Sequence, residues 1–260
     1  MHAALYISKT GLSAQDNRLT TISNNLANVA TNGFKRDRVA FEDLLYQIQR
    51  QPGASSTQDT ELPSGLQLGT GVRTVGTQKI FTQGALQTTT EALDVAINGR
   101  GFFEIQMPDG TSAYTRDGQF QLSADGELVT TLGLLLEPGI NIPENASTVT
   151  IGTDGVITAV VSGTGTVNIG TLNLVDFINP SGLEALGGNL YAETISSGNP
   201  QQNTPGQNGM GTLVQGALEN SNVDVVEELV DMITTQRAYE MNSRVISTAD
   251  QMLQFITQNL

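Results

Sequence analysis

Apolar residues recur at every seventh position near both ends of this chain, and this repeat limits the fold more than any other feature. A seven-residue apolar repeat places one narrow apolar stripe along a helix, which is the spacing of coiled-coil seams. The N-terminal row is Leu5, Leu12, Leu19 and Leu26, and the C-terminal row is Val225, Met232, Tyr239, Ile246, Leu253 and Leu260.

Further apolar residues widen both stripes and set the expected helix ends. The sequence predicts one helix over residues 1–31, which Asn32-Gly33 would end, and a second over 223–260, about 57 Å long, with Ser221 or Asn222 as its cap. The residues that would pack between subunits also include Ile22 and Val29 in the first helix, and Leu229, Ile233 and Ile256 in the second.

Two arrangements of these helices fit the pattern. The two helices pack on each other in an ordinary core, or their stripes face both each other and neighbouring subunits. Narrow stripes on two terminal helices cannot all be buried within one monomer. The pattern therefore favours a chain that assembles.

The spacing of apolar residues changes in the middle of the chain. Residues 32–71 contain a stretch rich in Pro, Gly, Ser, Thr and Gln, which predicts an extended loop or linker. From Val72 to about residue 219, short apolar runs alternate with turns. Four Asp-Gly pairs, beginning at Asp109, Asp117, Asp125 and Asp154, predict hairpins. The expected fold class is α+β: a module of two long terminal helices (1–31 with 220–260), forming a coiled coil, around an inserted, mostly antiparallel β domain (72–219).

Composition excludes several kinds of chemistry. Cysteine is absent and His2 is the single histidine, so thiolate metal sites and most imidazole mechanisms are excluded. No catalytic or metal-binding residues and no cofactor are predicted. The acids Glu227, Glu228 and Asp231 indicate a solvated helix face rather than a metal or acid–base site. A secreted β-domain hydrolase or sugar-binding module with helical appendages remains as the alternative.

Charge and hydropathy limit the classes of partner that the chain is expected to bind. The net charge is −14, and it is uneven: residues 1–50 carry +2 and the remainder −16. A chain whose residues after position 50 are so acidic is not expected to bind nucleic acid. No run approaches the length of a membrane span, so no direct membrane insertion is expected, and the N-terminus does not read as a cleavable secretory signal.

Long motifs in both helices and in the middle of the chain resemble the bacterial flagellar basal-body rod and hook family. Residues 23–36 (SNNLANVATNGFKR) resemble one family signature, in which the motif residues are Asn24, Asn25, Asn28, Asn32, Gly33 and Phe34. Residues 228–233 (ELVDMI) and 236–243 (QRAYEMNS) are similar to the second signature, and 94–103 (DVAINGRGFF) with 113–118 (AYTRDG) are similar to the central motif. The length, and residues 41–46, 50–54 and 62–72, are most similar to the distal-rod branch; a proximal rod paralogue is the near alternative.

The resemblance implies a structural subunit and no enzyme. Such subunits are exported unfolded by the flagellar type III export apparatus and form a helical homopolymer. The implied polymer is a tubular drive shaft that crosses the periplasm, reaches the outer membrane and transmits torque from motor to hook. Its implied partners are other copies of the chain, proximal rod proteins, the hook protein, and the P-ring and L-ring proteins.

Overall fold

The chain folds into two compact units between which it passes repeatedly. A computed structural model describes residues 2–53, 63–162 and 165–258. Unit 1 combines the terminal segments 2–27 and 224–258 with Asp37–Gln78, and unit 2 combines Asn28–Arg36 with Lys79–Val223. Two terminal helices and a strand-rich middle confirm the α+β class. The boundaries differ from those expected at residues 31, 71 and 219, because Asp37–Gln78 groups with the helices.

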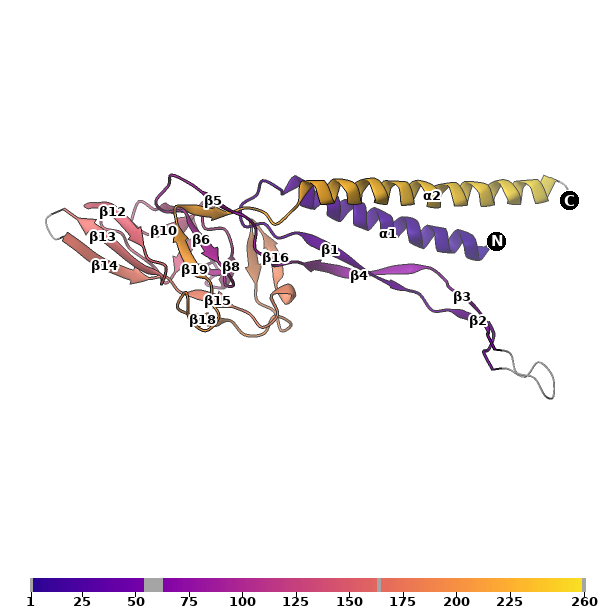
Figure 1. The fold of residues 1–260 in the computed structure, drawn as a ribbon, viewed down its shortest axis with the longest axis horizontal. Coiled ribbons are helices and arrows are strands. Elements are labelled where there is room, and N and C mark those ends of the chain that lie inside the picture. Colours follow the sequence, from indigo (N-terminus) through magenta and orange to yellow (C-terminus); the bar gives the residue numbers. More distant parts are fainter. Residues whose placement is uncertain (1, 54–62, 163–164, 259–260) are drawn as a thin grey trace. The chain divides into compact units, whose positions relative to one another are not determined.

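Two long helices dominate unit 1. Helix α1 spans His2–Ala27 and helix α2 spans Val225–Gln258. They lie side by side, with the N- and C-terminal ends of the chain at the same end of the pair (Figure 1). The two helices are therefore antiparallel.

Both helix boundaries differ from the predicted ones for local reasons. The cap of α2 is Asp224, whose Oδ1 accepts the N–H groups of Val226 at 2.9 Å and Glu227 at 3.3 Å. Ser221 and Asn222 are not the cap, since their side chains accept the N–H groups of Val223 and Arg36. These contacts correct the predicted cap.

Helix α1 ends at Ala27, four residues before the predicted end. The N–H of Thr31 donates to the carbonyl of Asn28, and the hydroxyl of Thr31 donates to the side chain of Asn28. Such local hydrogen bonds compete with those of a continuing helix. Gly33 does adopt a left-handed conformation, with φ of 69°. A Cβ at Gly33 would lie 2.8 Å from the backbone carbon of Arg116, so only glycine fits this close approach.

Strands occupy part of the segment that the sequence assigns to an extended loop. Strand β1 (Asp37–Asp43) is hydrogen-bonded to β4 (Val72–Lys79), and β2 (Gln47–Arg50) pairs antiparallel with β3 (Leu66–Leu68). The loop prediction is wrong for these strands, because their backbones pair with strands that begin more than 15 residues later in the chain. Residues 54–62 of the predicted loop, and Leu260, lie outside the described residues.

Unit 2 is built from antiparallel ladders, as predicted. A seven-stranded sheet has the order β16-β17-β8-β7-β11-β10-β9, a three-stranded sheet has the order β12-β13-β14, and β15–β18, β19–β6 and β20–β5 form pairs. A 3-10 turn lies at Pro180–Gly182. The strands are β5 (Leu86–Thr88), β6 (Val95–Asn98), β7 (Phe103–Gln106), β8 (Ser112–Thr115), β9 (Phe120–Leu122), β10 (Leu128–Thr130), β11 (Leu135–Glu137), β12 (Ala146–Ile151), β13 (Val156–Val161), β14 (Gly165–Thr171), β15 (Leu174–Asp176), β16 (Glu184–Gly187), β17 (Leu190–Ala192), β18 (Gln201–Asn203), β19 (Thr212–Gln215) and β20 (Ala217–Glu219).

Three of the four Asp-Gly pairs form the predicted hairpins. The glycines of the pairs at Asp109, Asp125 and Asp154 have φ of 83°, 82° and 85° and lie between β7 and β8, β9 and β10, and β12 and β13. Asp117-Gly118 is not a hairpin, since β8 and β9 do not pair. Gly118 is instead needed for close packing, because a Cβ there would collide with the carbonyl oxygen of Val95.

The core of unit 2 is apolar and aromatic. Phe103, Ile105 and Ile157 are fully buried in the main cluster. A second cluster is aromatic: Phe102, Tyr114, Phe177 and Tyr191 pack edge-to-face with centroids 4.8–6.1 Å apart. Burial raises the pKa of Tyr114 to about 12, so its hydroxyl stays neutral. Unit 2 therefore has a core of its own, although a few large apolar side chains, such as Ile178 and Ile195, are exposed.

Candidate assembly site on the terminal helices

The contact between α1 and α2 is centred on small and polar side chains. Gly11, Arg18 and Asn25 lie seven residues apart on α1. A Cβ at Gly11 would lie 3.2 Å from the side chain of Asn242, and Asn25 Nδ2 donates to Glu228 Oε1 at 3.2 Å. Arg18 forms an ion pair of 3.2 Å with Asp231 that is about half exposed and so contributes about 1 kcal/mol at most.

The facing row on α2 is also polar. Glu228, Thr235 and Asn242 lie seven residues apart, and Thr235 is only 2% exposed. These polar rows were not predicted, because the seven-residue repeat was sought among apolar residues only. The seven-residue spacing of Gly11, Arg18 and Asn25 is the signal that would have revealed them.

The predicted packing residues of α1 lie beside this polar row. Ile22 is buried, and the other members of the set are half-buried: Leu5, Leu12, Leu19, Leu26 and Val29. Residue Val29 follows the end of α1 and belongs to unit 2. The helix pair thus covers the leucine row only in part.

The predicted packing residues of α2 are more exposed. Val225, Leu229, Ile233 and Tyr239 are between 39% and 51% exposed. Met232, Ile246 and Leu253 are half-buried. Ile256 lies in α2, and its side chain is outside what the structure describes.

The motif residue Asn25 fixes the path of the chain after α1. Its Oδ1 accepts the N–H of Asp37 and its Nδ2 donates to the carbonyl of Asp37, both at 2.9 Å. Since Nδ2 also donates to Glu228, one buried amide joins α1, α2 and the start of β1. Loss of this side chain would leave the polar groups of Asp37 and Glu228 without these partners.

Four other motif residues, Asn28, Asn32, Gly33 and Phe34, lie in the segment 28–36 of unit 2. Asn28 accepts the hydroxyl of Thr31, and the carbonyl of Asn32 accepts the side chain of Asn189 at 2.9 Å. Phe34 is buried beneath the ammonium of Lys79, which lies 5.3 Å from the ring centroid. Asn24 is exposed on α1.

A groove runs along the helix pair where polar and apolar groups meet. It has a volume of about 360 Å³ and is lined by residues of both helices: Gln15, Asp16, Leu19, Thr235, Gln236, Tyr239 and Glu240. The Oε1 atom of Gln15 is buried and accepts no hydrogen bond from the described residues. The groove therefore offers an apolar wall and an unused acceptor.

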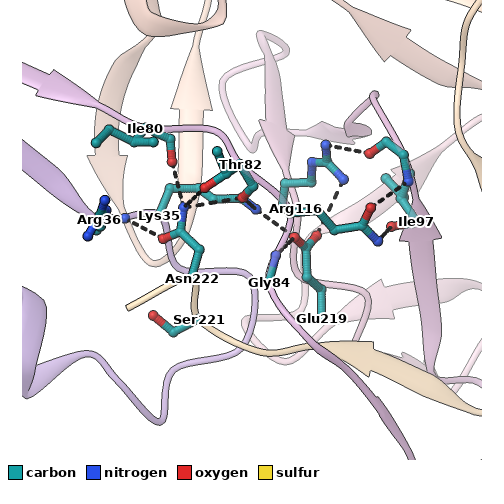
Figure 2. Close-up of polar contacts among 12 residues, drawn as sticks. Lys35, Arg36, Ile80, Thr82, Gly84, Ile97, Arg116, Glu219, Ser221 and Asn222 are labelled. Atoms are coloured by element: carbon teal, nitrogen blue, oxygen red, sulfur yellow. Dashed lines mark hydrogen bonds and ion pairs between the residues drawn. The ribbon is translucent and has the colours of Figure 1, made fainter. Parts of the chain in front are cut away.

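A buried ion network lies in unit 2, where the signature segment ends (Figure 2). Glu219 is fully buried and accepts bonds from Lys35 Nζ at 2.6 Å, the N–H of Gly84 at 2.9 Å and Arg116 at 3.3 Å. Burial lowers the pKa values of Lys35 and Arg116, and the carboxylate of Glu219 opposes that shift. Lys35 and Glu219 were not predicted as site residues, because a pair 184 residues apart leaves no local signal in the sequence.

Comparison with known proteins decides the family. Residues 5–35 match the family described as flagella basal body rod protein, 96–159 match the flagellar hook protein FlgE/F/G D1 domain, and 214–259 match the flagellar basal body rod FlgEFG protein C-terminal family. The chain is 60% identical to the flagellar basal-body rod protein FlgG of Buchnera aphidicola subsp. Schizaphis graminum, over 99% of this chain and 100% of that protein. The chain belongs to the flagellar basal-body rod protein family.

Two further relatives place the chain within the rod protein family. It is 45% identical to the FlgG of Borreliella burgdorferi, over 97% of both proteins. It is 33% identical to the FlgF of Caulobacter vibrioides, over 100% of this chain and 98% of that protein. The chain is therefore closer to these FlgG proteins than to this FlgF protein.

Membership in the rod protein family settles the broad function. The chain is a non-enzymatic structural subunit of the flagellar basal body, which assembles with other rod and hook components and serves motility. In the described part of the chain, neither helix is long and apolar enough to cross a membrane. The same residues contain no cluster of three His or acidic side chains that could hold a metal.

Proposed function

We propose that the chain polymerises through its terminal helices into a helical tube, which acts as a drive shaft. The observation that carries this proposal is the apolar face that α2 leaves exposed. Membership in the rod protein family is consistent with assembly, and the exposed apolar side chains of unit 1 provide a reason for polymerisation.

The exposed face of α2 points away from α1. Residues two apart on a helix differ by about 200°, so Ile233 lies on the side opposite to Thr235, which is buried in the helix contact. Six apolar side chains of α2 are 51–70% exposed: Val226, Val230, Ile233, Met241, Met252 and Phe255. All but Met252 lie within about 80° of Ile233, and Met252 lies toward a groove that it lines with Ala4 of α1. An apolar stripe of this kind indicates a surface that another helix covers.

The size of this stripe predicts cooperative assembly. Burying half of each of six side chains would contribute on the order of 5–9 kcal/mol. Association costs about 4–15 kcal/mol in lost freedom. One contact between two copies is therefore marginal, whereas a subunit that joins a growing end and meets several neighbours is stable. This favours a soluble monomer that polymerises on a template.

The groove between α1 and α2 is a second proposed contact with a neighbouring copy. An apolar side chain would fit between Leu19 and Tyr239, and an adjacent donor would satisfy Gln15 Oε1. We propose that the terminal helices pack in this way as a coiled-coil tube. The packing residues are those predicted above, from Leu5 to Val29 and from Val225 to Ile256.

The β2–β3 ribbon supports the same interpretation. The apolar side chains of the ribbon and of the two residues before β2 are all exposed, by 43–89%: Leu45, Tyr46, Ile48, Leu66 and Leu68. A two-stranded ribbon is marginally stable alone in water. Contact with neighbouring copies would cover these side chains and stabilise the ribbon.

The proposed assembly assigns a role to each predicted region. The terminal-helix module (1–31 with 220–260) would form the inner wall of the tube, the β domain (72–219) the outer layer, and 32–71 the link. The tube would cross the periplasm and reach the outer membrane, transmitting torque from motor to hook. Its partners would be other copies, proximal rod proteins, the hook protein, the P-ring and L-ring proteins, and the type III export apparatus.

A pair of matched variants tests the apolar face. Met241→Asp places a charge on the exposed apolar side of α2, and Ser243→Asp places the same charge about 200° away on an exposed polar side. We expect both monomers to fold, because both positions are exposed. Met241→Asp should abolish rods in electron micrographs of basal bodies and abolish swimming, while Ser243→Asp retains both. Normal rods with Met241→Asp would refute the proposal.

A further inference from the structure

Three of the four chain crossings between the units are tied together within unit 2. The chain leaves or enters unit 2 after residues 27, 36, 78 and 223. Arg36, Ile80 and Asn222 each lie within two residues of a different one of the last three crossings. Figure 2 shows these residues in one hydrogen-bonded group.

The side-chain amide of Asn222 is the centre of this group. Its Oδ1 accepts the N–H of Arg36 at 2.8 Å. Its Nδ2 donates to the carbonyl of Ile80 at 2.7 Å, and to the hydroxyl and carbonyl oxygens of Thr82 at 2.9 and 3.2 Å. One side chain thus holds the backbones of two other crossing segments.

Backbone bonds join the same segments pairwise. The N–H of Ile80 donates to the carbonyl of Arg36 at 2.9 Å, and the N–H of Gly33 donates to the carbonyl of Glu219 at 2.7 Å. The three segments therefore form a small bundle with the side chain of Asn222 at its centre.

The buried ion network extends this bundle into the interior. Lys35 Nζ donates both to Glu219 and, at 2.8 Å, to the carbonyl of Thr82. Arg116 joins Glu219 to the carbonyl of Gly99, which it contacts at 2.8 Å. A buried ion pair adds little to stability beyond apolar residues of the same size, so stability alone does not account for it. It does impose one geometry on the segments that it joins.

We propose that Asn222 and the Lys35–Glu219–Arg116 network form a junction lock, which makes the three crossing segments carry mechanical load together. A load on one segment must break the bonds that join it to the other two before that segment can stretch alone. The lock is a positioning device and not a folding requirement. This inference rests on the proposed role in torque transmission.

The first test measures the lock in the purified full-length monomer by amide hydrogen exchange. Asn222→Ala should raise exchange at Arg36 and Ile80 by about twofold to tenfold, since each lost bond is modest. Exchange at Ile105, in the core strand β7, should not change. The control is Asn141→Ala, which removes a comparable bond from an asparagine side chain to the carbonyl of Asp125 elsewhere in unit 2. Equal exchange at Arg36 in wild type and Asn222→Ala would overturn the lock.

A milder variant protects this test against unfolding. Lys35→Met removes one of two cations around Glu219, which leaves a balanced pair with Arg116. It should raise exchange at Gly33 and Ile80 while the core amides stay protected. If both variants instead lose protection throughout unit 2, the network is required for folding and the proposal is overturned.

The second test applies load to cells. Strains with Asn222→Ala or Lys35→Met should build rods and swim normally in dilute medium, but lose speed more steeply than wild type or Asn141→Ala as viscosity rises. Identical speed–viscosity curves would overturn the mechanical role, as would folded variants that build no rods. Failure of the proposed polymer is seen separately, as normal rods with Met241→Asp.

Discussion

The two units use apolar side chains in opposite ways. In unit 2, Phe103 and Ile157 lie in a fully buried core, and the exposed faces of the strands are largely polar. In unit 1, the contact between the helices contains Arg18, Asn25 and Thr235, whereas residues such as Ile233 are exposed.

The two units therefore depend on other copies of the chain to different degrees. The β domain has a core that is complete within one chain, and its exposed apolar residues, such as Ile178 and Ile195, lie outside that core. The helix pair is held in place by hydrogen bonds and partial contacts, so its largest apolar gain is still available to other copies. The stable unit and the assembling unit are thus distinguished by where the apolar atoms lie.

The largest expected effect comes from removing α2. A chain that ends at residue 224 should build no rods, and cells that carry it should not swim, because the exposed stripe is lost. Unit 2 should keep its calorimetric unfolding transition, since its core lies before residue 224. Rods built by the truncated chain would show that the two units do not divide stability and assembly as described.

A smaller effect is expected from a substitution in the core of unit 2. Phe103→Ala removes a fully buried ring and should lower the free energy of unfolding of unit 2 by about 3–5 kcal/mol. Chemical denaturation of the purified monomer measures this. A loss under about 1 kcal/mol would mean that the core is less complete than its burial indicates.

A smaller effect tests the same kind of change in unit 1. Ile233→Ala deletes an exposed side chain and should change monomer stability by at most about 0.5 kcal/mol. It should nevertheless weaken polymerisation, raising the critical concentration about tenfold for each 1.4 kcal/mol of lost contact. Sedimentation of seeded assembly reactions gives that concentration. A large loss of monomer stability would place Ile233 in an intramolecular core instead.

The smallest effect concerns charge within unit 2. Burial, and then the carboxylates of Glu137 and Glu193, raise the pKa of Glu104, while a bond from Ser112 opposes this. A carboxyl group with a raised pKa binds its proton more tightly in the folded state than in the unfolded state. The free energy of unfolding therefore falls as the pH rises above 4.5, the ordinary pKa of a glutamate side chain. Glu104→Gln should remove part of this fall.

Calorimetry between pH 4 and 7 measures that dependence. The melting temperature of Glu104→Gln should decline less than that of wild type over this range. Asp117, whose pKa burial also raises, should keep a residual dependence. The exposed Glu144→Gln is the matched control, and an identical profile for it and Glu104→Gln would contradict the assignment.

Much of the fold could be predicted from periodicity, and the failures have physical reasons. The two helices and the hairpins at Asp109, Asp125 and Asp154 depend on local spacing and turn chemistry, which a sequence displays directly. Gly118 has the same Asp-Gly signal but serves close packing against Val95, which only the tertiary structure reveals.

The candidate site was harder to predict because it depends on distant pairs. The contact of Asn25 with Glu228, and that of Lys35 with Glu219, join residues about 200 positions apart. The apolar rows were visible, but their exposure was not, since a heptad pattern states which residues share a face and not what covers that face. The polar rows that include Gly11 and Thr235 lie in the contact between the helices, so the apolar rows are left partly exposed.

The most direct test of the central claim is the accessibility of α2 in monomer and in rod. The chain has no cysteine, so Met241→Cys gives a single thiol for maleimide labelling, and Thr235→Cys gives a reference that is buried already in the monomer. Met241→Cys should label quickly in the monomer and at least about tenfold more slowly in assembled rods. Equal labelling of Met241→Cys in both states would contradict the claim that neighbouring copies cover this face.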